Sequence, residues 1–158
     1  MPPEPASPVI TVAAASVDDP ELVNLITALD AELNPLYPEE SRHGYDLTKL
    51  QTRPVTLFIA RLDGLARACG GVEINGSDAE IKRMYVHPAA RGIGLGQQIL
   101  AAIEQHAAQA KCTVIRLETG IHQHAAIKLY SQAGYREIPA FSPYKPDPVS
   151  VFMAKALG

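Results

Sequence analysis

Three alternating glycines, Gly92, Gly94 and Gly96, follow an apolar strand-like run and precede a long amphipathic segment. Glycine lacks a Cβ, so the backbone N–H groups of such a turn can close around an anion at the start of a helix. The third glycine comes too early for a dinucleotide fingerprint, and Gln97 stands where a nucleotide phosphate loop needs lysine. The pattern predicts a pyrophosphate site, with a purely steric use of glycine in a tight turn as the alternative.

Two segments together resemble the GNAT superfamily of N-acetyltransferases. The run Arg91-Gly92-Ile93-Gly94-Leu95-Gly96 is similar to its motif A, Arg/Gln-x-x-Gly-x-Gly/Ala, and the run from Ala126 to Tyr135 is similar to its Ala-x-x-Leu-Tyr-x-x-x-Gly-Phe/Tyr block. The resemblance implies acetyl-coenzyme A as co-substrate. No metal is expected, because His122 and His124 are a poor helix-face pair and no third ligand is implied. It implies that the cofactor is held by the loop Arg91–Gln97 and by the strand residues Met84, Tyr85 and Val86. Gln123 stands where many members carry a coenzyme A-contacting asparagine.

The resemblance also implies how protons would move during acetyl transfer. An alkylamine with a pKa near 10 is mostly protonated at neutral pH, so the reaction needs a base for the amine and an acid for the departing thiolate. Tyr130 matches the family tyrosine that serves as general acid, and a core aromatic is its alternative. Glu80 matches the base of the histone-modifying branch, and a solvated strand-end glutamate is its alternative. Glu73 and Glu118 are reserve bases or recognise a cationic substrate.

Residues outside the two motifs supply candidates for the acceptor pocket. Tyr37, His43, Arg83 and Tyr144 are predicted substrate-binding residues, with surface positions as their alternative. The segment from Pro143 to Met153 resembles an uncharacterised bacterial branch with Pro-Tyr-x-x-Asp-Pro-x-Ser-Val-Phe-Met. We expect transfer to the amine of a small molecule or amino acid by direct attack. A protein lysine or N-terminal amine as acceptor, and a non-catalytic acyl-coenzyme A sensor, stay open as alternatives.

Composition and charge limit the classes of protein to which the chain can belong. The chain has 158 residues, a net charge of −3 and no apolar run long enough to span a membrane. The segment from Met1 to Pro8 lacks the order of a signal peptide, so we expect a cytoplasmic protein. Nucleic-acid and membrane partners are not expected, and a homodimer is kept as a possible assembly. Cys69 and Cys112 lie in apolar stretches and predict buried free thiols.

Hydrophobic periodicity predicts one α/β (α+β) domain over residues 9–158, preceded by a flexible tail over residues 1–8. Strands are predicted over 9–14, 55–61, 65–74, 79–86, 113–118, 135–138 and 150–155, and helices over 20–34, 47–50, 95–110 and 122–133. The apolar parity of the fourth strand changes at Met84, which predicts a β-bulge. This order matches the GNAT fold, which implies a mostly antiparallel sheet of six to seven strands. In that family the sheet splays between the strands ending at Val86 and Glu118.

Overall fold

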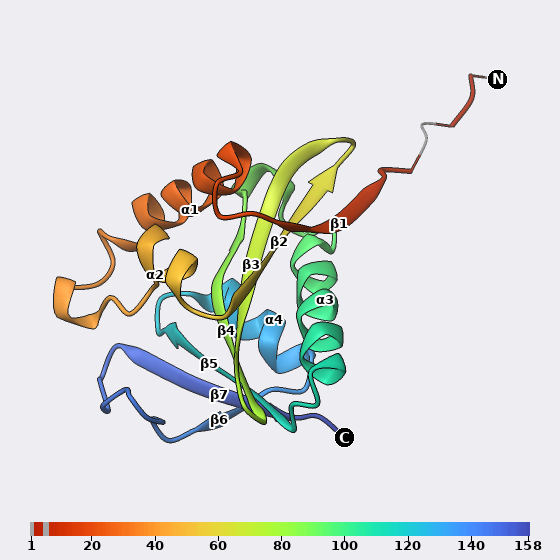
Figure 1. Cartoon of the computed structure of the whole chain (residues 1–158). Helices are drawn as coiled ribbons and strands as arrows, with labels where there is room; N and C mark the ends of the chain where they lie inside the picture. Colours follow the sequence, from red (N-terminus) through yellow and green to blue (C-terminus); the bar gives the residue numbers. More distant parts are fainter. Residues whose placement is uncertain (1, 5–6) are drawn as a thin grey trace.

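A seven-stranded mixed sheet forms the centre of the molecule (Figure 1). The computed structural model describes residues 2–4 and 7–158. The sheet order is β1-β2-β3-β4-β5-β7-β6, and every neighbouring pair is antiparallel except β4 and β5. Its strands are β1 (Ile10–Ala15), β2 (Val55–Leu62), β3 (Leu65–Asn75), β4 (Asp78–Val86), β5 (Val114–Gly120), β6 (Arg136–Ile138) and β7 (Ser150–Ala156).

The helices are α1 (Pro20–Leu33), α2 (Leu47–Thr52), α3 (Leu95–Gln109) and α4 (His124–Gln132), with short 3-10 turns at Glu39–Ser41 and Pro88–Ala90. The side chain of Asp19 accepts the N–H of Glu21 ahead of Pro20 at the first helical position, which fixes the start of α1. Asp46 caps α2 in the same way by accepting the N–H of Lys49.

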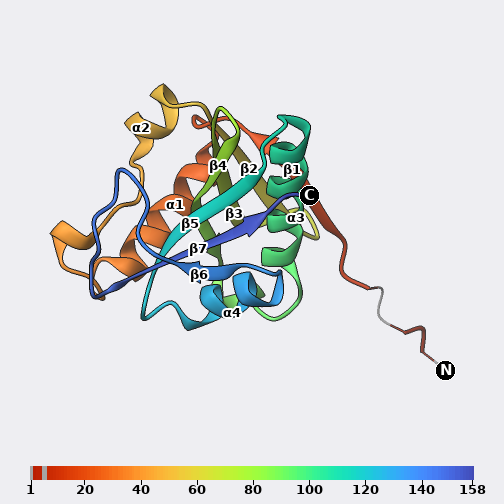
Figure 2. The ribbon, with the colours of Figure 1, turned by 90° about the horizontal axis from the view of Figure 1, so that it is seen from below.

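Each face of the sheet is covered by its own pair of helices (Figures 1 and 2). Leu22, Leu25, Ile26 and Leu29 of α1 pack with Leu50 of α2 into one apolar cluster against the sheet. Leu95, Ile99, Leu100 and Ile103 of α3 form a second cluster on the other face, together with Tyr130 of α4. These helices are amphipathic with buried stripes at helical spacing, which is why the two apolar clusters hold the sheet between them.

The predicted bulge lies in β4. Cys69 of β3 pairs with Tyr85 and Gly71 pairs with Lys82, so Gly70 faces two residues of β4. One of the two, Arg83, has a left-handed φ of 57°. The extra residue turns the Arg83 side chain toward α1, where it bonds Asp30, while Met84 and Val86 pack against the cluster on the α3 face. The bulge therefore causes the change of apolar parity that the sequence shows at Met84.

The sheet opens between β4 and β5. The two strands pair only from Asp78 to Glu80 and from Val114 to Arg116, so β4 continues from Ile81 to Val86 without a partner on that side. The predicted splay is confirmed. The backbone N–H and C=O groups along this edge of β4 have no strand partner there, so they can pair with a ligand.

The predicted fold class is confirmed, and the element boundaries differ only at their ends. Strand β5 runs to Gly120, beyond the predicted end at Glu118, and α4 begins at His124 because Gln123 precedes it with a non-helical ψ of 63°. Residues 2–4 and 7–9 carry no secondary structure; the rest of the predicted tail, residues 1, 5 and 6, lies outside the described residues.

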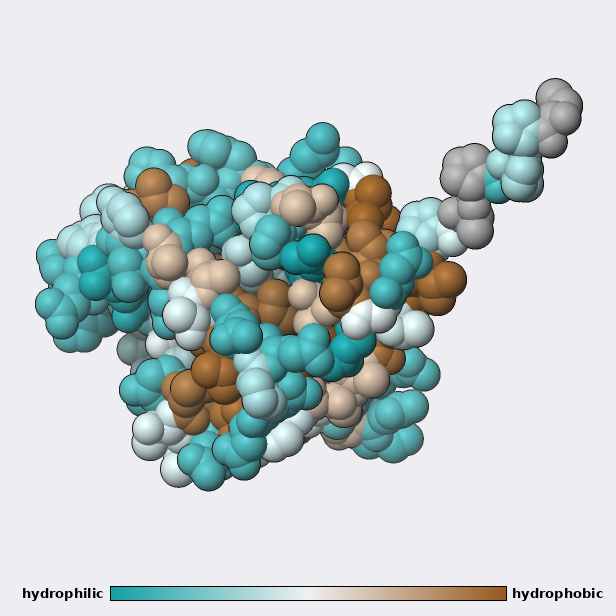
Figure 3. All heavy atoms as spheres, turned by 90° about the horizontal axis from the view of Figure 1, so that it is seen from above, coloured by the Kyte–Doolittle hydropathy of each residue, from teal (hydrophilic) through white to brown (hydrophobic). Residues whose placement is uncertain are grey.

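Cys69 and Cys112 are buried free thiols, as predicted. Burial raises the pKa of Cys69 to about 12, so this thiol is not a nucleophile at neutral pH. None of the helices over residues 2–4 and 7–158 is both long enough and apolar enough to span a bilayer. Seen from above, the surface is mainly hydrophilic, with several apolar patches, one of them where the chain enters β1 (Figure 3). Val9, just before β1, and Leu65, the first residue of β3, are exposed.

Candidate functional site

The predicted anion loop leads from β4 into the N-terminus of α3. Gly94 is the N-cap of α3 and has a φ of +95°, and Gly92 has a φ of +84°; both conformations favour glycine. A Cβ on Gly96 would lie 3.0 Å from Leu129 Cδ2, so this glycine allows α3 to pack closely on α4. The loop therefore presents the unpaired N–H groups of a helix start, and no side chain covers them at Gly92 or Gly94.

Arg91 holds this loop in place. Its Nε donates to the carbonyl of Val86 at 2.9 Å, and its Nη2 contacts both carboxylate oxygens of Glu32, at 2.9 and 3.1 Å. These contacts tie the loop to the end of β4 and to α1.

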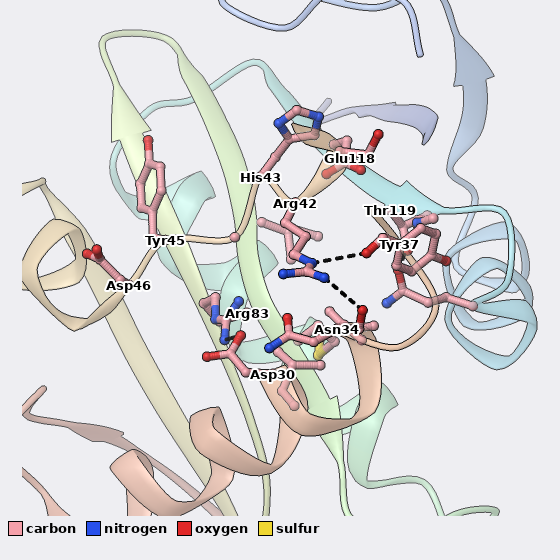
Figure 4. A pocket seen from close by; sticks show the side chains of 18 of the residues that line it. Asp30, Asn34, Tyr37, Arg42, His43, Tyr45, Asp46, Arg83, Glu118 and Thr119 are labelled. Atoms are coloured by element: carbon pink, nitrogen blue, oxygen red, sulfur yellow. Dashed lines mark hydrogen bonds and ion pairs between the residues drawn. The ribbon is translucent and has the colours of Figure 1, made fainter. Parts of the chain in front are cut away.

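A cavity of about 300 Å³ lies between α1, the loop after it, and the divergent strands β4 and β5 (Figure 4). Met84 of the bulge, Glu118 of β5 and Tyr130 of α4 line it together. The cavity thus joins the predicted acid, one reserve base and the bulge backbone. We call it the first cavity.

Tyr130 is buried in the apolar cluster and still lines the first cavity. Its ring lies 5.8 Å from that of Tyr135. Burial, and secondarily the charge of Glu118, raise the pKa of Tyr130 far above its ordinary value. The phenol therefore keeps its proton at neutral pH.

Glu118 lies partly buried at the end of β5. Burial raises the pKa of its carboxyl to about 7, and the nearby carboxylates of Glu80 and Asp147 add to the shift against the opposing charge of Lys82. A carboxyl with a pKa near neutrality suits proton transfer at physiological pH.

Glu80 has a different environment. Its Oε2 accepts a hydrogen bond from the Tyr144 hydroxyl at 2.5 Å and lies 2.6 Å from Lys82 Nζ. The same ammonium lies 2.7 Å from the Tyr144 hydroxyl and 3.8 Å from the centre of the Tyr45 ring. Glu80 is therefore buried and paired, which removes the alternative of a solvated strand-end glutamate.

Glu80 lines a second cavity of about 660 Å³, beside the first. Glu73 lies there too, with its carboxylate bonded to Arg53 at 2.7 Å, Tyr45 at 2.9 Å and Asn75 at 3.2 Å. Burial alone would raise the pKa of Glu73, but these hydrogen bonds hold it below its usual range. Three hydrogen-bond partners and a lowered pKa weaken this carboxylate as an acceptor of a substrate proton.

The predicted substrate residues divide between the two cavities. Tyr37 and Arg83 line the first, Tyr144 lines the second, and His43 lines both. The Tyr37 hydroxyl accepts a hydrogen bond from the backbone N–H of His122 at 3.0 Å. The hydroxyl lies so close to Gly120 that a Cβ on this glycine would overlap it.

Gln123 and the neighbouring histidines have local roles at the turn before α4. The side-chain oxygen of Gln123 accepts the N–H of Gly120 at 2.8 Å, and this residue also lines the first cavity. His122 and His124 are exposed. Among residues 2–4 and 7–158, no group of three His, Cys, Asp or Glu side chains has the arrangement of a metal site.

Two residues of the first cavity have no sequence signal. Arg42 lies in the aperiodic loop after α1, and its Nε and Nη2 donate to the carbonyls of Tyr37 and Asn34, at 3.0 and 2.9 Å (Figure 4). Asp30 of α1 pairs with Arg83. An aspartate in an amphipathic helix and an arginine in a polar loop are ordinary surface residues by pattern, so only the fold identifies them.

Comparison with known proteins agrees with this geometry. The Acetyltransferase (GNAT) family profile matches residues 26–135. An IAA acetyltransferase of Azospirillum brasilense is 40% identical over 152 residues, covering 95% of this chain and 99% of that protein. The chain belongs to the GNAT acetyltransferase family, and it is an enzyme of the N-acetyltransferase class.

Solved structures support the same assignment. A Klebsiella pneumoniae protein provisionally named an acyl-CoA N-acyltransferase superposes with a TM-score of 0.83 at 42% identity, over 94% of this chain and 98% of that one. The PaiA N-acetyltransferase of Thermoplasma acidophilum, solved in complex with coenzyme A, shares the fold with a TM-score of 0.75 at 18% identity, over 94% and 99% of the two chains.

The raised pKa of Glu118 predicts a pH-dependent stability. Because the folded-state pKa exceeds the unfolded one, the carboxyl stabilises the fold when protonated, and this contribution is lost as pH rises through about 7. Glu118→Gln cannot ionise, so its free energy of unfolding should exceed that of the wild type by on the order of 2 kcal/mol near pH 8 and by much less near pH 5. Urea unfolding measures both values. The control is Glu137→Gln on exposed β6; a Glu118→Gln difference that does not change with pH would contradict burial of an ionisable carboxyl as its cause.

Proposed function

We propose that the protein transfers an acetyl group from acetyl-coenzyme A to the amine of a small molecule or amino acid by direct attack. The observation that carries the proposal is the first cavity, which joins Met84, Glu118 and Tyr130 where β4 and β5 diverge. A cavity of about 300 Å³ is of a size that suits a small acceptor. The relative named IAA acetyltransferase supports the enzyme class.

In this proposal the cofactor lies across the open seam of the sheet. Its pyrophosphate binds the N–H groups of the loop from Arg91 to Gln97, and its pantetheine amides pair with the free edge of β4 at Met84, Tyr85 and Val86, as a neighbouring strand would. The coenzyme A complex of the PaiA enzyme, which shares the fold, supports this cofactor class. The thioester then reaches the first cavity at the bulge, whose backbone N–H groups would stabilise the oxyanion.

Two side chains handle the protons. Tyr130 donates its phenolic proton to the departing thiolate, and Glu118 receives the proton of the attacking amine, directly or through a water. We favour Glu118 over Glu80 as the base because Glu118 lines the same cavity as Tyr130, whereas Glu80 is already paired with Lys82 and Tyr144. Neither buried thiol is needed, so no acyl-enzyme forms.

The direct test of this function is a thiol-release assay with acetyl-coenzyme A, corrected for hydrolysis, over amino acids, small amines and peptides. Turnover with at least one free amino acid or small amine is expected. Turnover confined to peptides would favour a protein acceptor, and tight cofactor binding without turnover of any amine would favour a sensor.

The first functional prediction concerns the cofactor loop. Gly94→Val forces a branched side chain into a left-handed N-cap and covers N–H groups that would face the pyrophosphate. We expect the affinity for acetyl-coenzyme A, measured by calorimetry, to fall at least about tenfold. Gly64→Val is the matched control, since Gly64 has a similar φ of +84° in the β2–β3 turn. Equal losses of affinity in the two folded variants would refute the loop assignment.

The second functional prediction concerns the general acid. Tyr130→Phe keeps the buried ring and deletes its proton, so turnover at saturating acetyl-coenzyme A should fall by about 10² to 10⁴. Cofactor affinity should change little. Tyr135→Phe is the control, because it removes a neighbouring phenol that bonds Glu104 at 3.0 Å. A loss in Tyr130→Phe no larger than in the control would leave Tyr130 as a core aromatic.

The third functional prediction separates the two candidate bases. The rate should rise with pH through about 7 as Glu118 loses its proton. Glu118→Gln should remove this bend from the profile of kcat/KM against pH and lower kcat/KM by about 10² or more at neutral pH. Glu80→Gln should keep the bend. The opposite pattern would assign the base to Glu80, and a bend kept by both variants would assign it to solvent.

A further inference from the structure

The first cavity contains an arginine, Arg42, whose guanidinium is bonded to main-chain carbonyls and not to an acidic side chain in the described part of the chain. The two carbonyls are those of Tyr37 and Asn34, at the C-terminal end of α1. Over the described ranges 2–4 and 7–158, Arg42 forms no ion pair. The two carbonyls fix the plane of the guanidinium at the cavity wall, and its remaining donors are left for a ligand.

A second guanidinium lines the same cavity. The Arg83 side chain is only 4% exposed, and its Nη2 bonds Asp30 and the carbonyl of Ile26. Its Nε is buried and has no partner in the described part of the chain. Gly44 makes room for it, because a Cβ there would overlap Arg83 Nη1. A buried guanidinium with an unused donor costs free energy unless a ligand completes it.

The acidic side chains that line the cavity, Asp30, Asp46 and Glu118, leave Arg42 without an ion pair in the described part of the chain. Asp30 pairs with Arg83 instead. The carboxylate of Asp46 is already engaged as the cap of α2 through the N–H of Lys49. Glu118, which would meet the amine, lines the same cavity from β5 (Figure 4). A guanidinium binds a carboxylate through paired, charge-assisted hydrogen bonds.

We propose that the acceptor carries a carboxylate, which Arg42 and Arg83 bind while its amine faces Glu118. The acceptor class is therefore an amino acid and not a simple alkylamine. The inference rests on the proposed function, since it concerns the acceptor of the same cavity. It adds that an amide or a decarboxylated amine of equal size is a poor substrate, because it leaves Arg42 without an anion and the Nε of Arg83 without an acceptor.

The test uses probes that cannot be acetylated. Propionate, isovalerate and phenylacetate, each with its primary amide, are titrated against the protein with coenzyme A present, and binding is followed by ligand-observed NMR. At least one acid should bind about tenfold or more tightly than its amide. Arg42→Gln should remove this preference. Arg61→Gln, which loses a surface pair with Glu21 outside the cavity, should keep it.

The outcomes distinguish this inference from the proposed function. If no acid binds more tightly than its amide, or if Arg42→Gln keeps the preference, the carboxylate site is wrong even when amines are acetylated. If the acids bind as expected while the thiol-release assay finds no acetylated amine, the carboxylate site stands and the proposed function falls. Arg42 lies in an exposed loop, so its substitution avoids the risk that replacing buried Arg83 prevents folding.

Discussion

The β-bulge at Arg83 is the constraint on which the site depends. A regular strand would send Lys82 and Arg83 to opposite faces, and Arg83 would enter the apolar cluster below α3. The extra residue instead brings both side chains toward α1 and α2, and returns Met84 to the apolar side. Its left-handed φ of 57° is unfavourable for arginine, and the bonds to Asp30 and Ile26 offset that strain.

The same strand also determines where a cofactor can lie. β4 is fully paired with β3 up to Val86, but it pairs with β5 only as far as Glu80. One edge of β4 is therefore hydrogen-bonded to a neighbouring strand, and most of the other edge is not. Under the proposed function, a cofactor that pairs with the open edge would meet the glycine loop at the Val86 end. The first cavity, which Tyr130 lines, lies beside Ile81 and Met84 of the same strand.

Local patterns in the sequence predict most of the fold and part of the site. Helical spacing identifies α1 and α3, and the parity change at Met84 identifies the bulge. The environment of Glu80 is not predictable in this way, because Tyr144 reaches it from a loop that is distant in sequence and follows no period. The raised pKa of Glu118 arises from burial by several elements, which an alternating strand pattern does not express.

The loop from Arg42 to Tyr45 lines both cavities. It is a shared wall only four residues long, with Gly44 in contact with Arg83 on one side and Tyr45 bonded to Glu73 on the other. An exchange at any of these positions changes the shape of both chambers together. A substitution in this loop that enlarges or narrows one cavity therefore alters the volume available in the other at the same time.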